Sequence, residues 1–223
     1  MPLLDQKQNL IDLTKRSLAD EYEIAAIDHD YSYASTSWLP IKSYYLIFNV
    51  LLTIEYIFRL RKNVFKYSHA ACVDAFTKKL EQNLISFSEP ILNQVFDKTL
   101  LTLKTDSGAN LSSKTNLPDM FEMVIRKIAK YKDEDWKSKN KIDLRKSAHR
   151  EKHQKYLNSS FRVSIFDFAY FMRIRANYRD FAFIEGISSS ETFEYFGKYY
   201  GFTLNLIGAL DSLKTKLIAV RKR

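Results

Sequence analysis

The sequence predicts an all-α fold, an up-and-down bundle of helices with a helical and basic insertion over about residues 86–158. Hydrophobic residues make up 46% of the chain and aromatic residues 14%, which is enough for a packed core and excludes a wholly disordered chain. Five glycines and four prolines are too few for a turn-rich β-sandwich or β-barrel. Apolar residues instead recur at intervals of three and four, which is helical spacing. We expect a single domain over residues 1–223.

Apolar stripes predict the helices of the first half. They indicate helices over residues 3–18, 41–61, 68–84 and 89–104. Pro40 suits the start of the second helix, which is apolar almost all round and is expected to be buried. Ser68 is a suitable N-cap for the third helix. The polar and aromatic stretch 28–40 is expected to be a loop or a short irregular piece.

The second half is predicted to alternate loops with helices. Residues 106–116 have the composition of a loop. Pro118 is expected to open a helix that ends near Tyr131, and a strongly apolar helix is expected over residues 161–172. A short polar run is expected to separate that helix from the last one.

The last helix is predicted to begin at Ser188, which has capping-box spacing to Glu191. Intervals of three and four give it a seam that could pack against a partner, formed by Phe193, Phe196, Tyr200, Thr203, Ile207 and Leu210. Glycine is unfavourable inside a helix, so its presence here indicates a close crossing of another helix at Gly197, Gly201 and Gly208.

Charge and cysteine content narrow the class of protein. The 35 Lys and Arg residues exceed the 26 Asp and Glu residues, which gives a net charge of +9. The single cysteine, Cys72, excludes an internal disulfide framework and a cysteine-based zinc cluster, and it fits a reducing cytosol. The most apolar window, Tyr44–Phe58, is shorter than a membrane span and contains Glu55. We therefore expect a cytoplasmic protein that does not enter a membrane.

Residues 137–155, the basic segment, concentrate the positive charge. Eight Lys or Arg residues against two acids give it a net charge of +6. Ordinary surface helices mix their signs, so this clustering indicates a surface for an anionic partner, and the alternative is a solvated basic loop. The residues predicted to contact nucleic acid here are Lys141, Arg145, Lys146 and Arg150.

Most catalytic signatures are absent from the sequence. There is no Gly-rich phosphate loop, nucleophile elbow, HExxH motif or dinucleotide fingerprint, and we expect no cofactor. His149 and His153 have the i, i+4 spacing of a metal pair, but their mostly cationic neighbours favour two surface histidines. The triplet Asp28–His29–Asp30 gives equally weak support for a metal or acid–base role. We predict no metal site.

Three guanidinium groups occur within seven residues, in Arg173, Arg175 and Arg179. Arginine can contact a phosphate through two hydrogen bonds. Nearby, Tyr178 could stack on a base, and Asn177 could hydrogen-bond a ribose or a base edge. The alternative is structural, with Asp180 paired to one of the arginines and the run capping a helix junction.

Four segments together resemble the HEPN domain family: SYYLIFNVLLTIEYIF, SHAACVDAFTKKL, RIRANYRD and the long final helix. In that family a Tyr-Tyr-bearing helix precedes a helix that opens with Thr/Ser-His, and an Arg-x-x-Ala-Asp/Asn-Tyr run precedes the last helix. The matching segments, roughly Ser43–Leu84 and Phe161–Lys214, cover somewhat under half of the chain. The resemblance implies a helical bundle that dimerises, with the Arg-bearing segments of both protomers lining a shared cleft.

Many HEPN proteins are metal-independent ribonucleases, found as toxins, in abortive infection or as CRISPR-associated effectors. The resemblance makes Arg173 the family arginine, with Asn177 and Tyr178 in the Asn-Tyr positions. The family's nuclease motif has four to six residues between an Arg and the following His, and none of the four histidines here has that spacing: Arg145 and His149 are too close, and Arg61 and His69 are too far apart. Proton transfer would then depend on Tyr178, on Asp180 or on a distant residue such as His69, which is otherwise explained as a capping or buried structural histidine.

These observations leave three functions open. The first is a dimeric protein that binds single-stranded RNA, with or without ribonuclease activity, as a toxin of a prokaryotic defence or toxin–antitoxin system. The alternative is a non-catalytic helical subunit that partners a nucleotidyltransferase or a nucleic-acid effector complex. The third is a purely structural interaction protein. The expected partners are single-stranded RNA, a second copy of the chain, and a partner protein or antitoxin, and binding is better supported than catalysis.

Overall fold

The structure, a computed structural model, describes residues 2–36, 38–59, 62–102, 117–178 and 189–221. The described chain is mostly helical, which confirms the all-α prediction. It divides into two compact units, of which the first combines Met1–Leu92 with Ala169–Arg223 and the second is Asn93–Phe168. The second unit overlaps most of the insertion predicted for residues 86–158.

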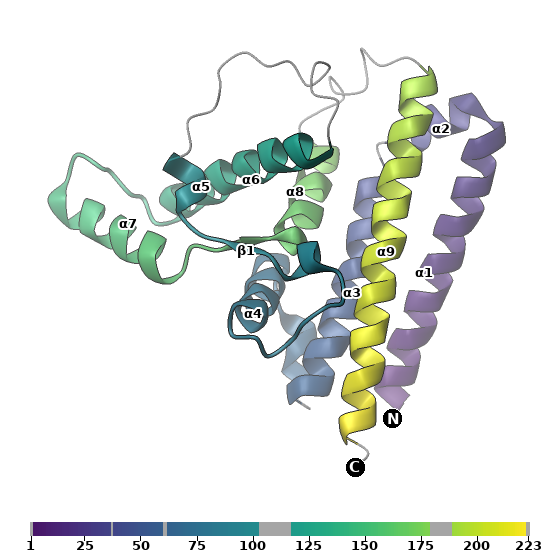
Figure 1. Ribbon diagram of the computed structural model, residues 1–223, viewed down its shortest axis with the longest axis horizontal. Coiled ribbons are helices and arrows are strands. Elements are labelled where there is room, and N and C mark those ends of the chain that lie inside the picture. The colour runs from purple at the N-terminus through teal and green to yellow at the C-terminus, as the bar shows by residue number, and fades with distance from the viewer. Residues whose placement is uncertain (1, 37, 60–61, 103–116, 179–188, 222–223) are drawn as a thin grey trace. The chain divides into compact units, whose positions relative to one another are not determined.

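The first unit is a bundle of long helices (Figure 1). α3 packs against α1, α4 and α9, and α9 also packs against α1 and α2. The elements of this unit are α1 (Pro2–Ile27), α2 (His29–Thr36), α3 (Leu39–Arg59), the 3-10 helix η1 (Lys62–Lys66), α4 (His69–Glu81), the 3-10 helix η2 (Pro90–Asn93) at its boundary, α8 (Ile165–Tyr178) from Ala169 onward, and α9 (Ser189–Arg221).

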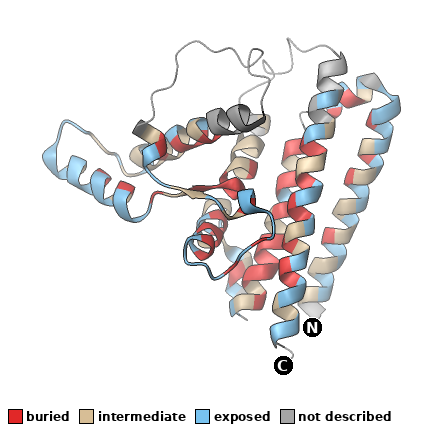
Figure 2. Cartoon of the chain, viewed as in Figure 1, coloured by how far each residue is buried: buried red, intermediate tan, exposed pale blue. Residues whose placement is uncertain are grey.

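α3 is the core helix of this bundle because apolar residues occupy most of its faces. Figure 2 shows much of this helix in the colour of buried residues. Of the described helices, it alone has the length and hydropathy that a membrane span requires, and 61% of its most apolar window is buried within the protein. Glu55 lies one turn before the end of α3, fully buried, and forms ion pairs with the buried Lys79 of α4 and with Arg59 of the same helix. Burial and an internal ion pair favour a core helix over a membrane span.

α1 and α9 run antiparallel along the bundle. Near one end, the ring of Tyr22 stacks on that of Tyr200 with their centroids 4.5 Å apart. Near the other end, Lys214 Nζ donates a hydrogen bond to Gln8 Oε1 at 2.7 Å. Between them, Lys15 forms an ion pair with Asp211. The start of α1 and the end of α9 therefore lie at the same end of the bundle.

The helix boundaries of the first unit follow local capping. Ser68 is the N-cap of α4, and its Oγ accepts a hydrogen bond from the backbone N–H of Ala71 at 3.2 Å, as predicted. The prediction of a loop over residues 28–40 is wrong, because most of that stretch forms α2. Asp28 Oδ1 accepts a hydrogen bond from the Tyr31 N–H at 2.9 Å and so caps this helix. The first helix also continues to Ile27, well beyond residue 18.

The structure corrects two predictions about the last helix, one from the burial of its seam and one from the free space around its glycines. Tyr200, Thr203, Ile207 and Leu210 are buried within the unit, where α9 packs against α1, α2 and α3. These four positions of the seam therefore pack against the protein's own helices, whereas the side chains of Phe193 and Phe196 fall outside the described part of the structure. The close helix crossing predicted at the glycines is also wrong. A Cβ atom built at Gly197, Gly201 or Gly208 would meet no described heavy atom within 4 Å.

In its described residues, the second unit joins a short antiparallel sheet to the helices α5, α6 and α7. Its elements are β1 (Val95–Phe96), α5 (Thr99–Thr102), α6 (Leu117–Lys139), α7 (Ser147–Ser159), β2 (Val163–Ser164) and the first turn of α8. Val95 lies opposite Ser164, and Phe96 lies opposite Val163. α5 and β2 pack against α6, and the ring of Trp136 stacks on that of Tyr156, 4.0 Å between centroids, which joins α6 to α7.

The prediction of one helix over residues 89–104 is wrong. Its apolar residues form η2, β1 and α5, because Val95 and Phe96 pair with β2. Asp97 then caps α5 by accepting a hydrogen bond from the Thr99 N–H at 2.9 Å. The loop predicted over residues 106–116 lies outside the described residues, and the following helix, α6, continues past Tyr131 to Lys139.

The helix predicted over residues 161–172 is α8, which begins at Ile165 and reaches Tyr178. The side chain of Asp167 caps its start. Asp167 Oδ2 accepts a hydrogen bond from the backbone N–H of Ser164 at 2.8 Å. Lys132 Nζ donates to Asp167 Oδ1 at 2.9 Å, which ties α6 to the same turn.

Candidate functional site

The arginine run predicted as a polar connector continues α8 as far as Tyr178. Arg173 is described with its side chain. Arg175, Asn177 and Tyr178 lie in the same helix, but their side chains fall outside the described part of the structure. Arg179 and Asp180 lie outside the described residues altogether. The site is therefore built around Arg173.

The guanidinium of Arg173 lies against two tyrosines of α3. Its Nη2 donates a hydrogen bond to the hydroxyl of Tyr45 at 3.1 Å. Its Cζ lies 5.3 Å from the ring centroid of Tyr45 and 5.7 Å from that of Tyr44, within the range of a cation–π contact. Arg173 forms no ion pair with another described residue, and its buried Nε has no hydrogen-bond partner among them. Most of its hydrogen-bonding capacity is thus not used within the described protein.

His69, the first residue of α4, belongs to the same cluster. Its ring centroid lies 4.3 Å from that of Phe48 and 5.6 Å from that of Tyr45. Its Nδ1 lies 3.1 Å from the Tyr44 hydroxyl. Ser68, not His69, caps the helix, so capping does not explain the position of the imidazole.

Electrostatics keep the imidazole neutral. Burial lowers the pKa of His69 below its ordinary value of 6.5, and the positive charge of Arg173 lowers it further. The imidazole is therefore mostly neutral near pH 7, with one ring nitrogen able to accept a proton. Burial raises the pKa of Tyr44 well above the usual range of a phenol, so its hydroxyl stays protonated beside His69.

Three helices supply this Arg173–His69 cluster. α3 contributes Tyr44, Tyr45 and Phe48, α4 contributes His69, and α8 contributes Tyr170 and Arg173. Tyr170 lies one helical turn before Arg173, and its ring centroid is 5.5 Å from that of Tyr44. Tyr44 is buried and Tyr45 is exposed, so the cluster reaches from the core to the surface.

The arrangement suits an anionic ligand. A guanidinium can hold phosphate oxygens and stabilise charge that develops on them, a neutral imidazole can accept a proton, and exposed aromatic rings can stack on bases. None of the six residues of the cluster is a carboxylate. Among the described residues, no group of three or more His, Cys, Asp or Glu side chains is placed to hold a metal ion.

The basic segment is a folded surface in the second unit. It covers the end of α6, a turn and most of α7. Its turn is held by Arg150 Nη1, which donates to the carbonyls of Leu144 and Arg145 at 3.1 and 3.2 Å. His149 Nδ1 accepts a hydrogen bond from the Asp143 N–H at 2.9 Å, which fixes the same turn. The alternative of a solvated loop therefore does not describe this segment.

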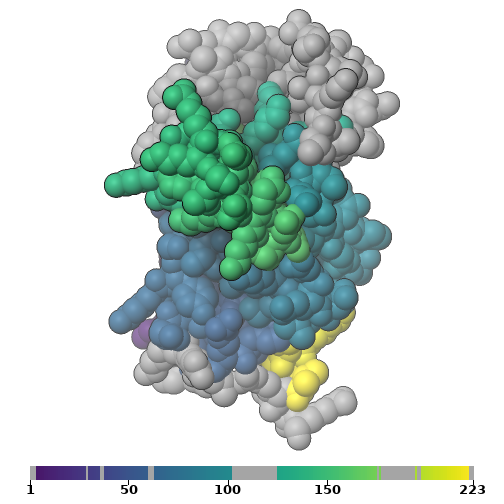
Figure 3. Space-filling model, turned by 90° about the vertical axis from the view of Figure 1, so that its left-hand side faces the viewer, coloured from purple at the N-terminus to yellow at the C-terminus, as the bar shows by residue number. Residues whose placement is uncertain are grey.

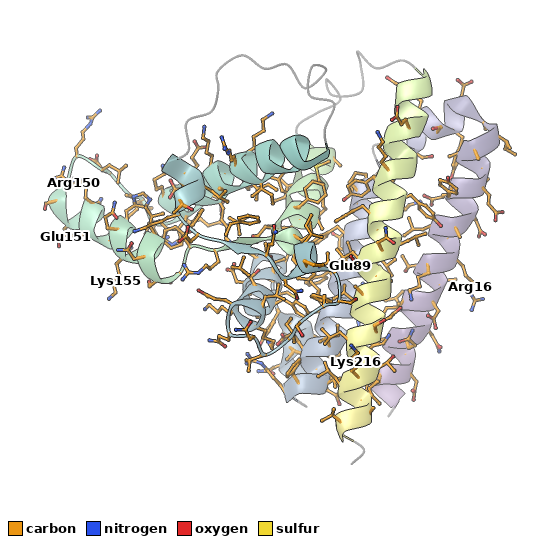
Figure 4. The ribbon with its side chains drawn as sticks, in the orientation of Figure 1. Arg16, Glu89, Arg150, Glu151, Lys155 and Lys216 are labelled. Carbon is orange, nitrogen blue, oxygen red and sulfur yellow. The ribbon has the colours of Figure 1, made fainter. Side chains whose placement is uncertain are left out.

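The four predicted contact residues of this segment are all exposed: Lys141, Arg145, Lys146 and Arg150. None of them forms an ion pair with a described residue, whereas Lys137 and Lys139 pair with acids of α6 one turn earlier. In Figure 3 the side chains of α7, in green, project from the surface, and Figure 4 shows Arg150 and Lys155 pointing outward. The unpaired positive charge thus gathers at the turn and on α7.

The histidines of α7 are not a surface pair. His153 is buried, and its Nε2 lies 2.6 Å from Asp133 Oδ1 of α6. The prediction of two surface histidines is therefore wrong for His153, whose ring is used in packing α7 on α6. Asp28 is used as a helix cap, and the side chain of His29 lies outside the described part of the structure.

Sequence reasoning identifies Arg173 but does not assign Tyr45 or Tyr170 to a site. The available signals are the Tyr-Tyr pair and the Ser-His pair, which by themselves indicate only a family resemblance. Their meaning depends on packing, because His69 and Arg173 come from helices far apart in the sequence.

Comparisons of this chain with family models, curated proteins and solved structures found no match. The resemblance to the HEPN family stays a prediction that rests on the sequence segments quoted above.

Proposed function

We propose that this protein is a HEPN-like, metal-independent ribonuclease that binds single-stranded RNA at the Arg173–His69 cluster. One observation carries the proposal. The structure brings a guanidinium without an acidic partner among the described residues to the same aromatic cluster as a neutral imidazole. The sequence lacks the usual Arg-to-His spacing, and His69 would supply the missing imidazole from another helix.

The proposed reaction uses each group for one task. Arg173 holds the non-bridging oxygens of the scissile phosphate and stabilises their charge in the transition state. With Nδ1 of His69 donating to the Tyr44 hydroxyl, its Nε2 accepts the proton of the ribose 2′-hydroxyl. The 2′ oxygen bonds to phosphorus, the bond to the 5′ oxygen breaks, and that oxygen takes a proton from solvent. The products are a 2′,3′-cyclic phosphate and a 5′-hydroxyl end.

The basic segment would bind RNA outside the reacting phosphate. Its exposed cations attract the sugar–phosphate backbone without reading sequence. By resemblance to the family, we further propose that the protein acts as a dimer and as a toxin of a prokaryotic defence or toxin–antitoxin system.

The direct test is cleavage of end-labelled single-stranded RNA by the purified protein in the presence of EDTA. We expect His69→Gln to lower the rate about 10²–10⁴-fold and Arg173→Ala to lower it about 10²–10³-fold. Arg173→Lys should fall between wild type and Arg173→Ala, because it keeps the charge and loses the planar fork. His29→Gln, at the first residue of α2, is the histidine control and should leave the rate unchanged.

A 2′-deoxy substitution at the scissile position should block cleavage while leaving binding intact. Equal activity of wild type and Arg173→Ala, or activity that disappears with EDTA, would contradict the proposed mechanism.

A second candidate, a non-catalytic RNA-binding subunit, is favoured specifically by the unpaired cations of the basic segment. It predicts RNA binding without cleavage. Replacing Lys141, Arg145, Lys146 and Arg150 by Gln should weaken binding and reduce the slope of log affinity against log salt by about 0.7 for each phosphate that the variant no longer neutralises. Unchanged affinity in that variant would exclude the basic segment as the binding surface.

A further inference from the structure

α1 exposes a stripe of apolar side chains away from the bundle. Leu10, Leu13, Ile24 and Ile27 are 43%, 64%, 42% and 87% exposed in the part of the chain that the structure describes. An adjoining face of α1, about 100° around the helix, carries buried residues of the bundle, including Ile11, Leu18 and Ala25. Figure 2 shows the outer side of α1 mostly in the colour of exposed residues.

The stripe has the spacing of a helix–helix interface. Its positions alternate in steps of three and four, which is the repeat of a coiled-coil seam. From one end to the other the stripe contains Leu10, Leu13, Ser17, Asp20, Ile24 and Ile27. Ser17 and Asp20 are exposed as well, so the whole stripe is without cover from described residues.

The stripe is also symmetric about the point between Leu18 and Ala19. Positions equally far from that point are alike in character: Leu10 matches Ile27, Leu13 matches Ile24, and Ser17 matches Asp20. A two-fold interface requires this property, because each residue i of one copy must suit residue j of the other while j suits i.

We propose that two copies of this chain dimerise through α1, with the two helices antiparallel about that point. In this register apolar residues form the outer layers and the polar pair forms the centre, where Ser17 Oγ can donate a hydrogen bond to the carboxylate of the partner's Asp20. A parallel, in-register pairing would instead place two Asp20 carboxylates against each other in the seam, which is unfavourable.

Charges beside the stripe fit the same register. Arg16 and Glu23 are exposed on one flank of α1, and neither forms an ion pair with a described residue. Figure 4 shows Arg16 pointing outward, away from α9. In the antiparallel pair, Arg16 faces the partner subunit's Glu23, and the two-fold axis repeats this contact. Complementary charges at flanking positions select partner and orientation.

The length of the α1–α1 contact limits the area that the dimer can bury and therefore its affinity. From Leu10 to Ile27 the helix rises about 26 Å at 1.5 Å per residue. One helix pair of this length lies near the lower limit of specific interfaces, about 1,000 Å² of total buried area, so the dimer should dissociate on dilution. No residue of this interface belongs to the Arg173–His69 cluster, so the α1 interface and the proposed cleavage chemistry can fail separately, although both proposals include a dimer.

Disulfide trapping tests the interface and its direction. The double variant Leu13→Cys/Ile24→Cys should form a covalent dimer under mild oxidation, because each cysteine faces the other position in the partner. The two positions are about 16 Å apart on one helix, too far for a bond within the chain. Leu13→Cys and Ile24→Cys alone should stay monomeric on non-reducing gels, and a mixture of the two should give the covalent dimer. The natural Cys72 is fully buried, and burial raises its pKa to about 12, so it does not compete.

Charge exchange provides the matched control. Arg16→Glu and Glu23→Arg should each shift wild-type protein toward monomer in sedimentation velocity, and the double exchange Arg16→Glu/Glu23→Arg should restore the dimer. A chain that sediments at its monomer mass of 26.2 kDa at every concentration overturns the proposal. So does cross-linking of Leu13→Cys alone, or three charge variants that behave like wild type.

Discussion

The guanidinium of Arg173 donates a hydrogen bond to the hydroxyl of Tyr45, 128 positions earlier in the chain, at 3.1 Å. The ring of the same tyrosine lies 5.3 Å from the guanidinium carbon. Tyr45 thus contacts Arg173 through both its hydroxyl and its ring. Because a long arginine side chain has many rotamers, these contacts reduce the freedom of the group that would meet a phosphate.

Tyr45→Phe should loosen Arg173 without removing it. The variant keeps the ring contact and loses one charged hydrogen bond at a partly exposed position, for which we expect about a tenfold loss in RNA cleavage. Tyr45→Ala should cost more, and both variants should keep the circular dichroism of wild type. Tyr33→Phe, at another exposed tyrosine of the bundle, is the matched control. A Tyr45→Ala variant as active as Tyr33→Phe would show that Tyr45 does not position Arg173.

The lowered pKa of His69 makes the reaction and the fold depend on pH in a defined direction. As a general base His69 must be neutral, so the cleavage rate should rise with pH through a midpoint below 6.5 and level off above it. The folded pKa also lies below the unfolded value. The contribution of His69 to stability is therefore complete above about pH 6.5 and is lost as pH falls through the folded pKa.

An NMR titration of the imidazole protons measures this pKa directly. Arg173→Gln should raise the midpoint of His69, because the nearby positive charge is one of the two causes of the shift. Lys78→Gln, on the exposed face of α4, should leave it unchanged. A midpoint at or above 6.5 in wild type would contradict the neutral imidazole.

Single substitutions in the buried pair of Glu55 and Lys79 should lower the unfolding free energy of the first unit more than most other substitutions do. Glu55→Ala leaves the Lys79 charge buried without its partner, which costs about 3–5 kcal/mol of unfolding free energy. Lys79→Ala should cost somewhat less, because Glu55 keeps Arg59, whose Nε lies 3.4 Å from its Oε2. Glu55→Leu combined with Lys79→Met removes both charges and should be close to neutral or stabilising. Urea unfolding measures these differences.

Lys78→Ala, one residue away and exposed, is the control for Lys79→Ala and should change the unfolding free energy by less than about 0.5 kcal/mol. Equal effects of the two lysine variants would contradict a buried ion pair.

Asp211 makes the contact between α1 and α9 sensitive to acid. Burial raises its pKa, but hydrogen bonds from Lys15 and Lys214 lower it more, so the folded pKa lies below the ordinary 3.8. Its stabilising contribution is present above about pH 4 and is lost as pH falls through the folded value. Asp211→Asn should lower the unfolding free energy at pH 7 by about 1–2 kcal/mol and reduce the acid sensitivity. Asp30→Asn, on the exposed start of α2, should do neither.

The elements that are predicted correctly are those with a strong local signal. The continuous apolar surface of residues 41–61 identifies α3, and the Ser68 cap places the start of α4. The stretch 28–40 is wrongly predicted because its serines and tyrosines are typical of loops, while the cap from Asp28 decides the outcome. Val95 and Phe96 fit a helical stripe, but they pair with a strand more than 60 positions away, which local spacing does not register.

The candidate site is predictable only in part for the same reason. Arg173 stands out because a cluster of arginines after an apolar helix is unusual. The neighbourhood of His69 depends on how three helices pack, and a motif defined by spacing along the chain cannot include it. The charges that lower or raise pKa values in this cluster act across helices, so only the fold reveals them.

The pairing of Val95 with Ser164 brings together the points where the chain enters and leaves its second unit. The segment between the two strands, from Asp97 to Arg162, is therefore an insertion whose two ends are held side by side by the strand pair. Such an insertion can be lengthened, exchanged or trimmed to a tight turn while the flanking helices keep their covalent spacing. The length of this segment can therefore change without altering how the chain enters and leaves the first unit.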